Sequence, residues 1–101
     1  MNENIPTHPG AVLRETVLPN LLGITKIEFA KMLGISRQTL YVLLAERTGV
    51  SAEMALRLGT LLGNGSHFWL DMQVQFDMWH AQAKLHDELK NMKPLRYFSE
   101  V

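Results

Sequence analysis

Residues 29–44 read FAKMLGISRQTLYVLL, and this stretch decides the fold. An apolar segment that suits a helix is interrupted by Gly34, and Ser36 follows two residues later. Glycine readily adopts the left-handed backbone conformation that ends a helix, and serine is a preferred helix N-cap. The stretch therefore predicts one helix that ends at Gly34 and a second helix that begins after Ser36.

The residues around this break have the sizes that a steep crossing of two short helices requires. Ala30 is small enough to let the two backbones approach, and Ile35 can fill the space beneath the turn. Four larger apolar side chains are expected to close the core between the helices: Phe29, Leu33, Leu40 and Leu43. The pattern predicts a helix-turn-helix.

The rest of the chain predicts an all-α domain, because apolar residues recur at steps of three and four and strand-like alternation is absent. Thr25 and Glu28 form a capping box, Ser51 is a further N-cap, and Ser66 restarts the chain after the Gly-Asn-Gly break. By residue number, the expected helices run from 9 to before 19, over 26–33, from 37 to about 47, from 52 to about 62, and from 67 to about 92. We expect a single domain over residues 1–101, with its core at about 8–80 and a helical extension and tail at about 81–101.

The composition excludes a strong electrostatic field around the whole protein, because ten basic residues balance ten acidic residues. A local excess of basic residues falls on residues 26–57. This segment contains five basic residues and three acidic residues: Lys26, Lys31, Arg37, Arg47 and Arg57 against Glu28, Glu46 and Glu53.

The chain has no cysteine, its first ten residues do not resemble a signal peptide, and no apolar run is long enough to cross a bilayer. We expect a cytoplasmic protein with no membrane contact.

The start of the second helix of the motif is the candidate binding surface. With Leu40 and Leu43 turned inward, an outward face remains, formed by Ser36, Arg37, Gln38, Tyr41 and Val42. Arginine and glutamine can pair with guanine and adenine in the major groove, and hydroxyls such as that of Thr39 can reach phosphates. The same residues could instead be only a helix cap followed by solvated side chains. Because Tyr41 and Val42 carry no charge, one copy should bind weakly, which favours a dimer on a two-fold symmetric, palindromic site.

Four segments together resemble the HigA family of antitoxins, small helix-turn-helix proteins similar to lambda-repressor-like domains. They are HPGAVLRETVLP at 8–19, the opening stretch at 29–44, GVSAEMALRLGTLLG at 49–63 and SHFWLDMQVQFDMW at 66–79. The resemblance implies a five-helix domain with a long C-terminal helix. It also implies a homodimeric repressor that binds double-stranded operator DNA, controls its own operon and neutralises a HigB-type ribonuclease toxin.

Carried over by position, the DNA-binding residues are Ser36, Arg37, Gln38, Thr39 and Tyr41. The chain departs from the family at two places. The family usually has a small polar residue where Tyr41 stands, and a glycine near Glu46.

Other patterns in the long C-terminal helix have plainer interpretations. The seam from Trp69 to Trp79 is expected to be core, although it could be a partner-binding face. Contact with a second subunit or a toxin is expected further along, at Leu85, Leu89, Met92, Leu95, Tyr97 and Phe98. His80 and His86 are spaced for different helix faces, so we expect no metal and no cofactor, and an Asp77–His80 surface pair.

No nucleophile elbow, glycine-rich phosphate loop or paired carboxylates indicate an enzyme. Two alternatives to an antitoxin remain open. One is a stand-alone helix-turn-helix regulator without a toxin, and the other is a protein-interaction module that has lost DNA binding.

Overall fold

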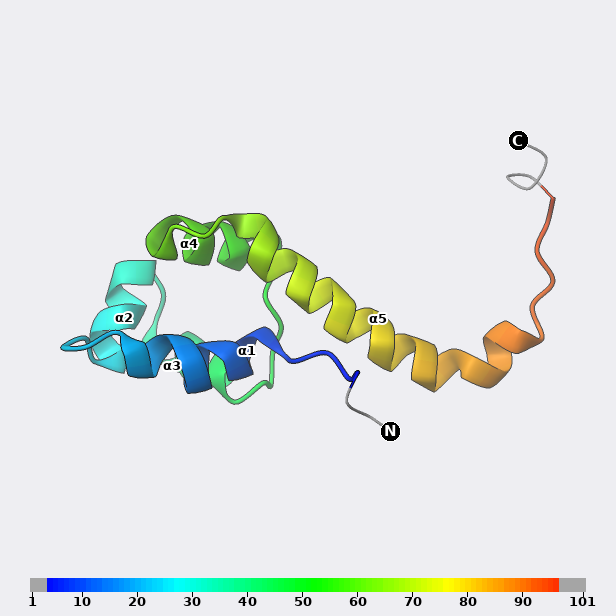
Figure 1. Ribbon diagram of the computed structural model, residues 1–101, viewed down its shortest axis with the longest axis horizontal. Helices are drawn as coiled ribbons and strands as arrows, with labels where there is room; N and C mark the ends of the chain where they lie inside the picture. The colour runs from blue at the N-terminus through cyan, green and yellow to red at the C-terminus, as the bar shows by residue number, and fades with distance from the viewer. Residues whose placement is uncertain (1–3, 97–101) are drawn as a thin grey trace.

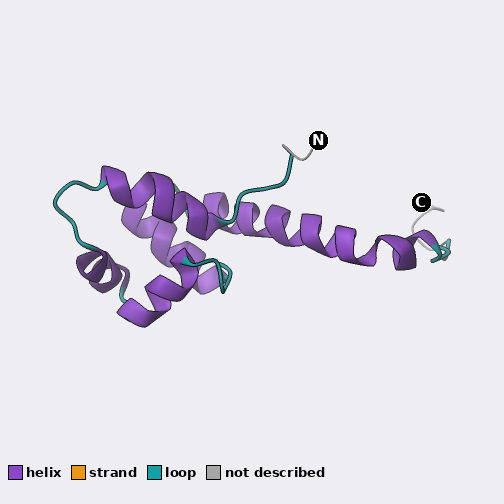
Figure 2. Ribbon diagram, turned by 90° about the horizontal axis from the view of Figure 1, so that it is seen from below, coloured by secondary structure: helices purple, strands orange, loops and turns teal. Residues whose placement is uncertain are grey.

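The computed structural model describes residues 4–96, which form helices and no strand (Figures 1 and 2). In chain order the elements are α1 (Pro9–Val12), the π-helical η1 (Leu13–Val17), the 3₁₀-helical η2 (Leu18–Asn20), α2 (Lys26–Leu33), α3 (Arg37–Leu44), α4 (Ala52–Leu62) and α5 (Ser66–Lys90). The all-α class is confirmed.

The expected caps are present at the starts of α2, α3 and α4. The Thr25 hydroxyl accepts a hydrogen bond from the Glu28 amide at 3.1 Å, and the Glu28 carboxylate accepts one from the Thr25 amide at 2.9 Å. The hydroxyls of Ser36 and Ser51 likewise accept from amides three residues later. Gly34 ends α2 in the left-handed conformation, with φ of 77°. Local capping chemistry therefore sets the boundaries of the motif.

Three predicted boundaries were wrong. The first helical segment continues past Pro19, which lies in the first turn of η2, where a backbone donor is not needed. α3 ends at Leu44 rather than near Arg47, because the chain turns into a left-handed conformation at Glu46, with φ of 62°. α5 spans Ser66–Lys90, so it begins one residue before the expected start at 67 and ends before the expected end near 92.

The core lies where α2, α3 and α4 meet the first helical segment and the start of α5. Its buried apolar cluster includes all four residues expected to close the motif, and among the described residues it contains Leu13, Phe29, Ala30, Leu33, Leu40, Leu43, Leu44, Val50, Ala55, Leu58 and Trp69. Ile35 is half-buried against this cluster, as expected. A side chain at Gly10 would clash with the carbonyl oxygen of Leu43, so the first helical segment crosses α3 in direct backbone contact.

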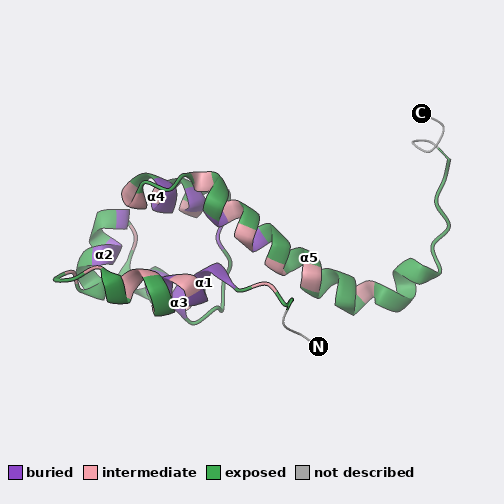
Figure 3. Ribbon diagram, in the orientation of Figure 1, coloured by how far each residue is buried: buried purple, intermediate pink, exposed green. Residues whose placement is uncertain are grey.

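α5 begins in the core and then projects away from it (Figures 1 and 3). Trp69 is buried, Met72, Phe76 and Trp79 are half-buried, and Ala83 is exposed. The prediction that the aromatic seam is core is therefore confirmed for Trp69 and holds only in part beyond it. The chain extends 55 × 31 × 22 Å, and its radius of gyration of 17.3 Å exceeds the roughly 13 Å of a compact domain of this length.

Candidate DNA-binding interface

The predicted site residues share the exposed face of α3. Ser36, Arg37, Gln38, Thr39 and Tyr41 are all exposed, from the N-cap to the second turn, whereas Leu40, Leu43 and Leu44 are buried. Val42, which was also expected on the outer face, is half-buried. The structure thus brings together the five residues that the sequence singled out.

The first turn of α3 is ordered by its own hydroxyl groups. The Ser36 hydroxyl accepts from the Thr39 amide at 3.0 Å and donates to the Thr39 hydroxyl at 2.8 Å. Arg37 and Gln38 lie between these two residues. Their backbone N–H groups point out of the start of the helix, as those of the first turn of any helix do. Because such a turn carries partial positive charge, it suits contact with a phosphate group.

Two arginines outside the motif hold the ends of its helices. Arg57 of α4 donates to the carbonyl oxygen of Leu33 at 2.9 Å, at the end of α2. Arg14 donates to the carbonyl oxygen of Leu44 at 2.6 Å, at the end of α3, and pairs with Glu46 at 3.1 Å. Each guanidinium satisfies a carbonyl that helix ends leave without a partner.

The charge on Arg14 is secured by its neighbours. Hydrogen bonds to Glu15 first, and then to Glu46, raise the pKa of Arg14 above its ordinary value. The Arg14 guanidinium is therefore charged at neutral pH, where it joins the first helical segment to the end of α3.

Gln73 connects the loop after α3 to α5. Its side chain is buried, and its carbonyl oxygen accepts from the Val50 amide at 2.8 Å, while its amide group donates to Asp77 at 2.9 Å. A side chain at Gly49 would lie 2.8 Å from Gln73, so the loop packs closely on this residue. The position of the loop thus depends on one buried amide.

The expected Asp77–His80 surface pair was wrong. Asp77 accepts from Gln73, and the His80 ring lies instead against Phe76 and Trp79, at centroid distances of 4.3 and 5.0 Å. Phe76 also contacts the buried His8 ring edge-on at 4.8 Å, which ties the N-terminal segment to α5.

Lys26, the first residue of α2, lies beside the exposed face of α3. Its ammonium nitrogen is 5.9 Å from the centre of the Tyr41 ring, within cation–π range. Both residues are exposed. Lys26 therefore adds a positive charge to the edge of the predicted site.

Sequence reasoning missed Lys26, Arg14, Arg57 and Gln73. The two arginines give no local signal, because their carbonyl partners are 30 and 24 residues away in the chain. Gln73 and Asp77 did carry a signal, since both belong to the FWLDMQVQFDMW segment, but their roles depend on a contact with a distant loop.

Within residues 4–96, no group of three or more histidine, aspartate or glutamate side chains is placed to hold a metal ion. Over the same residues, no helix has the length and apolar character needed to span a bilayer.

Comparison with known families matches residues 18–70 to the helix-turn-helix family model. Two curated relatives are similar over most of their length. Antitoxin HigA-1 of Vibrio cholerae serotype O1 is 34% identical over 91 residues, which cover 89% of this chain and 84% of the relative. Virulence-associated protein I of Dichelobacter nodosus is 35% identical over 81 residues, which cover 80% and 74%.

Solved structures of similar proteins share the architecture. Antitoxin GraA superposes with a TM-score of 0.79 at 38% identity, over 89% of this chain and 97% of its own. A structure titled Pseudomonas aeruginosa antitoxin HigA with higBA promoter superposes with a TM-score of 0.81 at 31% identity, over 89% and 98%. GraA has also been solved in complex with its operator, at a TM-score of 0.78 and 38% identity, over 89% and 91%.

Proposed function

Because this chain belongs to the helix-turn-helix family and, within it, to the HigA antitoxins, we propose that it is a sequence-specific DNA-binding repressor and the antitoxin of a toxin–antitoxin pair. It acts by binding rather than by catalysis, in the cytoplasm, where its operator lies. The observation that carries the proposal is the outward face of α3, on which Ser36, Arg37, Gln38, Thr39 and Tyr41 are exposed together.

DNA recognition follows from the chemistry of this face. α3 enters the major groove with its first turn foremost, Arg37 pairs with guanine, and Gln38 pairs with adenine. Ser36 and Thr39 lie at the helix start, where hydroxyls and amides meet the phosphate backbone. The relatives solved with promoter or operator DNA support this assignment.

A second copy of the chain completes the binding unit. An apolar stripe on α5 steps by 4, 3, 4 and 4 residues, which places its members on one side of the helix: Val74, Met78, Ala81, Leu85 and Leu89, with Met92 following just beyond the end of α5. All are exposed except Leu85, which is half-buried. Tyr97 and Phe98, also expected to make this contact, lie outside the described residues.

Charge complementarity favours an antiparallel pairing of two α5 helices. Residues 66–83 hold two acidic residues, Asp71 and Asp77, and no lysine or arginine. Residues 84–96, at and beyond the end of α5, have an excess of two positive charges: Lys84, Lys90, Lys93 and Arg96 against Asp87 and Glu88. Antiparallel packing places each acidic end beside the basic end of the other copy and buries the apolar stripe between them.

The toxin partner is proposed on family membership. Curated relatives include an antitoxin named HigA-1, so we propose a HigB-type ribonuclease toxin as the second partner of this chain. Co-expression with the product of a small basic reading frame beside its gene tests this. Co-purification of the two chains and relief of growth arrest are expected, whereas a gene with no such neighbour would favour a stand-alone regulator.

The DNA-binding proposal is tested by titrating the protein against a labelled duplex from upstream of its own gene. We expect a specific complex that survives about 150 mM salt and a scrambled duplex that binds much less tightly. The chain has zero net charge, so its non-specific affinity should be low. Absence of any specific complex would favour the protein-interaction module.

A further inference from the structure

We propose that Lys26 contacts a phosphate at the wall of the groove that α3 enters, and that the Tyr41 ring is the positioning residue that holds Lys26 there. This inference rests on the proposed operator binding. It adds a contact from α2 to the interface and gives Tyr41 a function that does not require it to read a base.

The geometry begins with the placement of Tyr41. Its side chain is 44% exposed on the same face of α3 as Arg37 and Gln38, so it lies at the surface that a duplex would cover. The ammonium nitrogen of Lys26 is 5.9 Å from its ring centre. A lysine side chain otherwise moves freely at the surface, and the negative face of an aromatic ring restricts it.

A positive charge at this place suits contact with a phosphate of the DNA backbone. Phosphates line both walls of the major groove, which is about 12 Å wide, so a helix inside it leaves the phosphates beside its neighbours. Lys26 is the first residue of α2, where the helix dipole and the free amides also favour an anion. The adjacent carboxylate of Glu28 is occupied by the Thr25 amide at 2.9 Å in the capping box.

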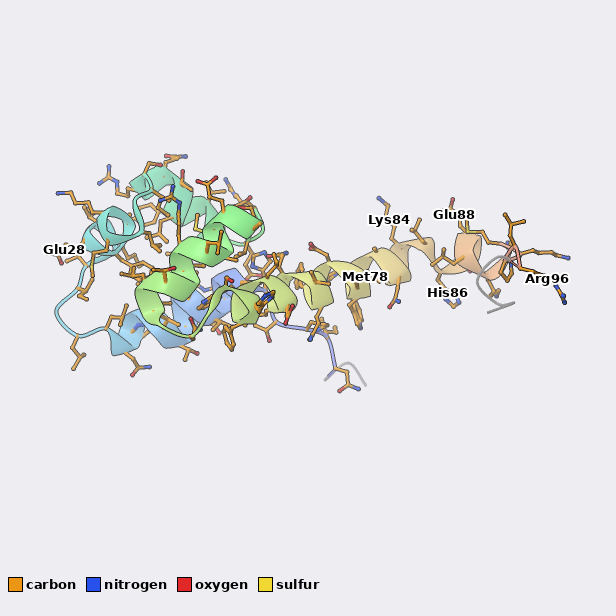
Figure 4. All side chains as sticks on the ribbon, turned by 90° about the horizontal axis from the view of Figure 1, so that it is seen from above. Glu28, Met78, Lys84, His86, Glu88 and Arg96 are labelled. Carbon is orange, nitrogen blue, oxygen red and sulfur yellow. The ribbon has the colours of Figure 1, made fainter. Side chains whose placement is uncertain are left out.

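The test measures operator affinity as a function of salt concentration. Each phosphate neutralised contributes about 0.9 to the slope of log K against log salt. Lys26→Ala should lower the magnitude of that slope by about 0.9 and weaken binding most at low salt. Lys84→Ala removes the same charge from the projecting part of α5, far from Glu28 and α2 along the molecule (Figure 4), and should leave the slope unchanged.

The role of the ring is tested by combining substitutions. Tyr41→Phe keeps the ring and removes only the hydroxyl. In this background Lys26→Ala should weaken operator binding as much as it does in the wild-type background, which would show that the ring and not the hydroxyl positions Lys26. Lys26→Ala should also be made in the Tyr41→Leu background. There the factor by which Lys26→Ala weakens operator binding should be about two- to fivefold smaller than in the wild-type background, which corresponds to the energy of an exposed cation–π pair. Circular dichroism of each variant checks that the fold is intact.

The outcomes separate this inference from the proposal on which it rests. Wild-type protein that binds no operator overturns both. Wild-type binding with an unchanged slope for Lys26→Ala overturns the phosphate contact alone. An equal effect of Lys26→Ala in the Tyr41→Leu and wild-type backgrounds overturns the positioning role of the ring.

Discussion

At the scale of single residues, the same short segment carries both the fold and the proposed activity. Leu40 and Leu43 anchor α3 in the core, whereas Arg37, Gln38 and Tyr41 of the same helix are exposed. When one side of an eight-residue helix is buried in the core, the residues on its other side are exposed as a direct result. Substitutions on the outer face should therefore change binding while stability is retained.

Arg37→Ala is expected to weaken specific operator binding by about 1–3 kcal/mol and to relax the preference at one base pair, because it removes a paired contact to guanine. Binding to a panel of single-base operator variants measures this. Arg37→Lys is the matched control, since it keeps the charge but loses the forked geometry, and it should recover non-specific affinity alone. Unchanged base preference in Arg37→Ala would show that Arg37 does not read the operator.

Gln73→Leu should lower the free energy of unfolding by about 1–3 kcal/mol, because the Val50 amide loses its buried acceptor. Thermal unfolding followed by circular dichroism measures the loss. Gln75→Leu makes the same change at an exposed position of α5 and should have little effect. Equal melting temperatures for the two variants would contradict the proposed role of Gln73.

At the scale of elements, helix ends are set partly by neighbours in sequence and partly by distant side chains. The starts of α2, α3 and α4 are closed by residues within the same turn. The end of α2 is closed by Gly34, also within the same turn, and is then held by Arg57 of α4, whereas the end of α3 is held by Arg14 of η1. This explains why the predicted starts of these helices were accurate, whereas the predicted end of α3 was wrong.

The capping box at the start of α2 gives a pH prediction. Hydrogen bonding to the Thr25 amide, and then to its hydroxyl, lowers the pKa of Glu28 below its ordinary value of 4.5. Because the folded state holds the lower pKa, the stabilisation is present above pH 4.5 and is lost as the pH falls through the folded pKa.

We therefore expect the melting temperature of wild-type protein to fall more steeply below pH 4.5 than that of Glu28→Gln, which keeps an acceptor that does not titrate. Melting curves from pH 7 to pH 3 measure the difference. Parallel pH profiles would show that the carboxylate does not contribute through its charge.

At the scale of the whole molecule, the compact core and the projecting half of α5 have different roles. Trp69 and Gln73 fasten the start of α5 to the domain, and beyond Trp79 the helix is almost entirely exposed. An exposed apolar stripe on a projecting helix is costly to leave in water, and burial against a second copy removes that cost.

Met78→Glu should convert a dimer into a monomer, because it places charge in the centre of the proposed interface. Sedimentation or light scattering at micromolar concentration measures the mass. Ala83→Glu adds the same charge on the opposite side of α5, where the side chain is exposed, and should leave the dimer intact. Identical masses for the two variants would remove α5 as the dimer interface.

The sequence by itself determined the class, the helix-turn-helix and the outward face of α3, because capping residues, Gly34 and helical periodicity act within a few residues of one another. Only the tertiary structure decided where Arg14, Arg57 and Gln73 bind, that Lys26 stands over Tyr41, and how far α5 leaves the core. These features join residues that are distant in the chain. Arg14, Arg57 and Gln73 bind backbone groups, and every residue has the same backbone groups, so the sequence does not reveal which residue is the partner.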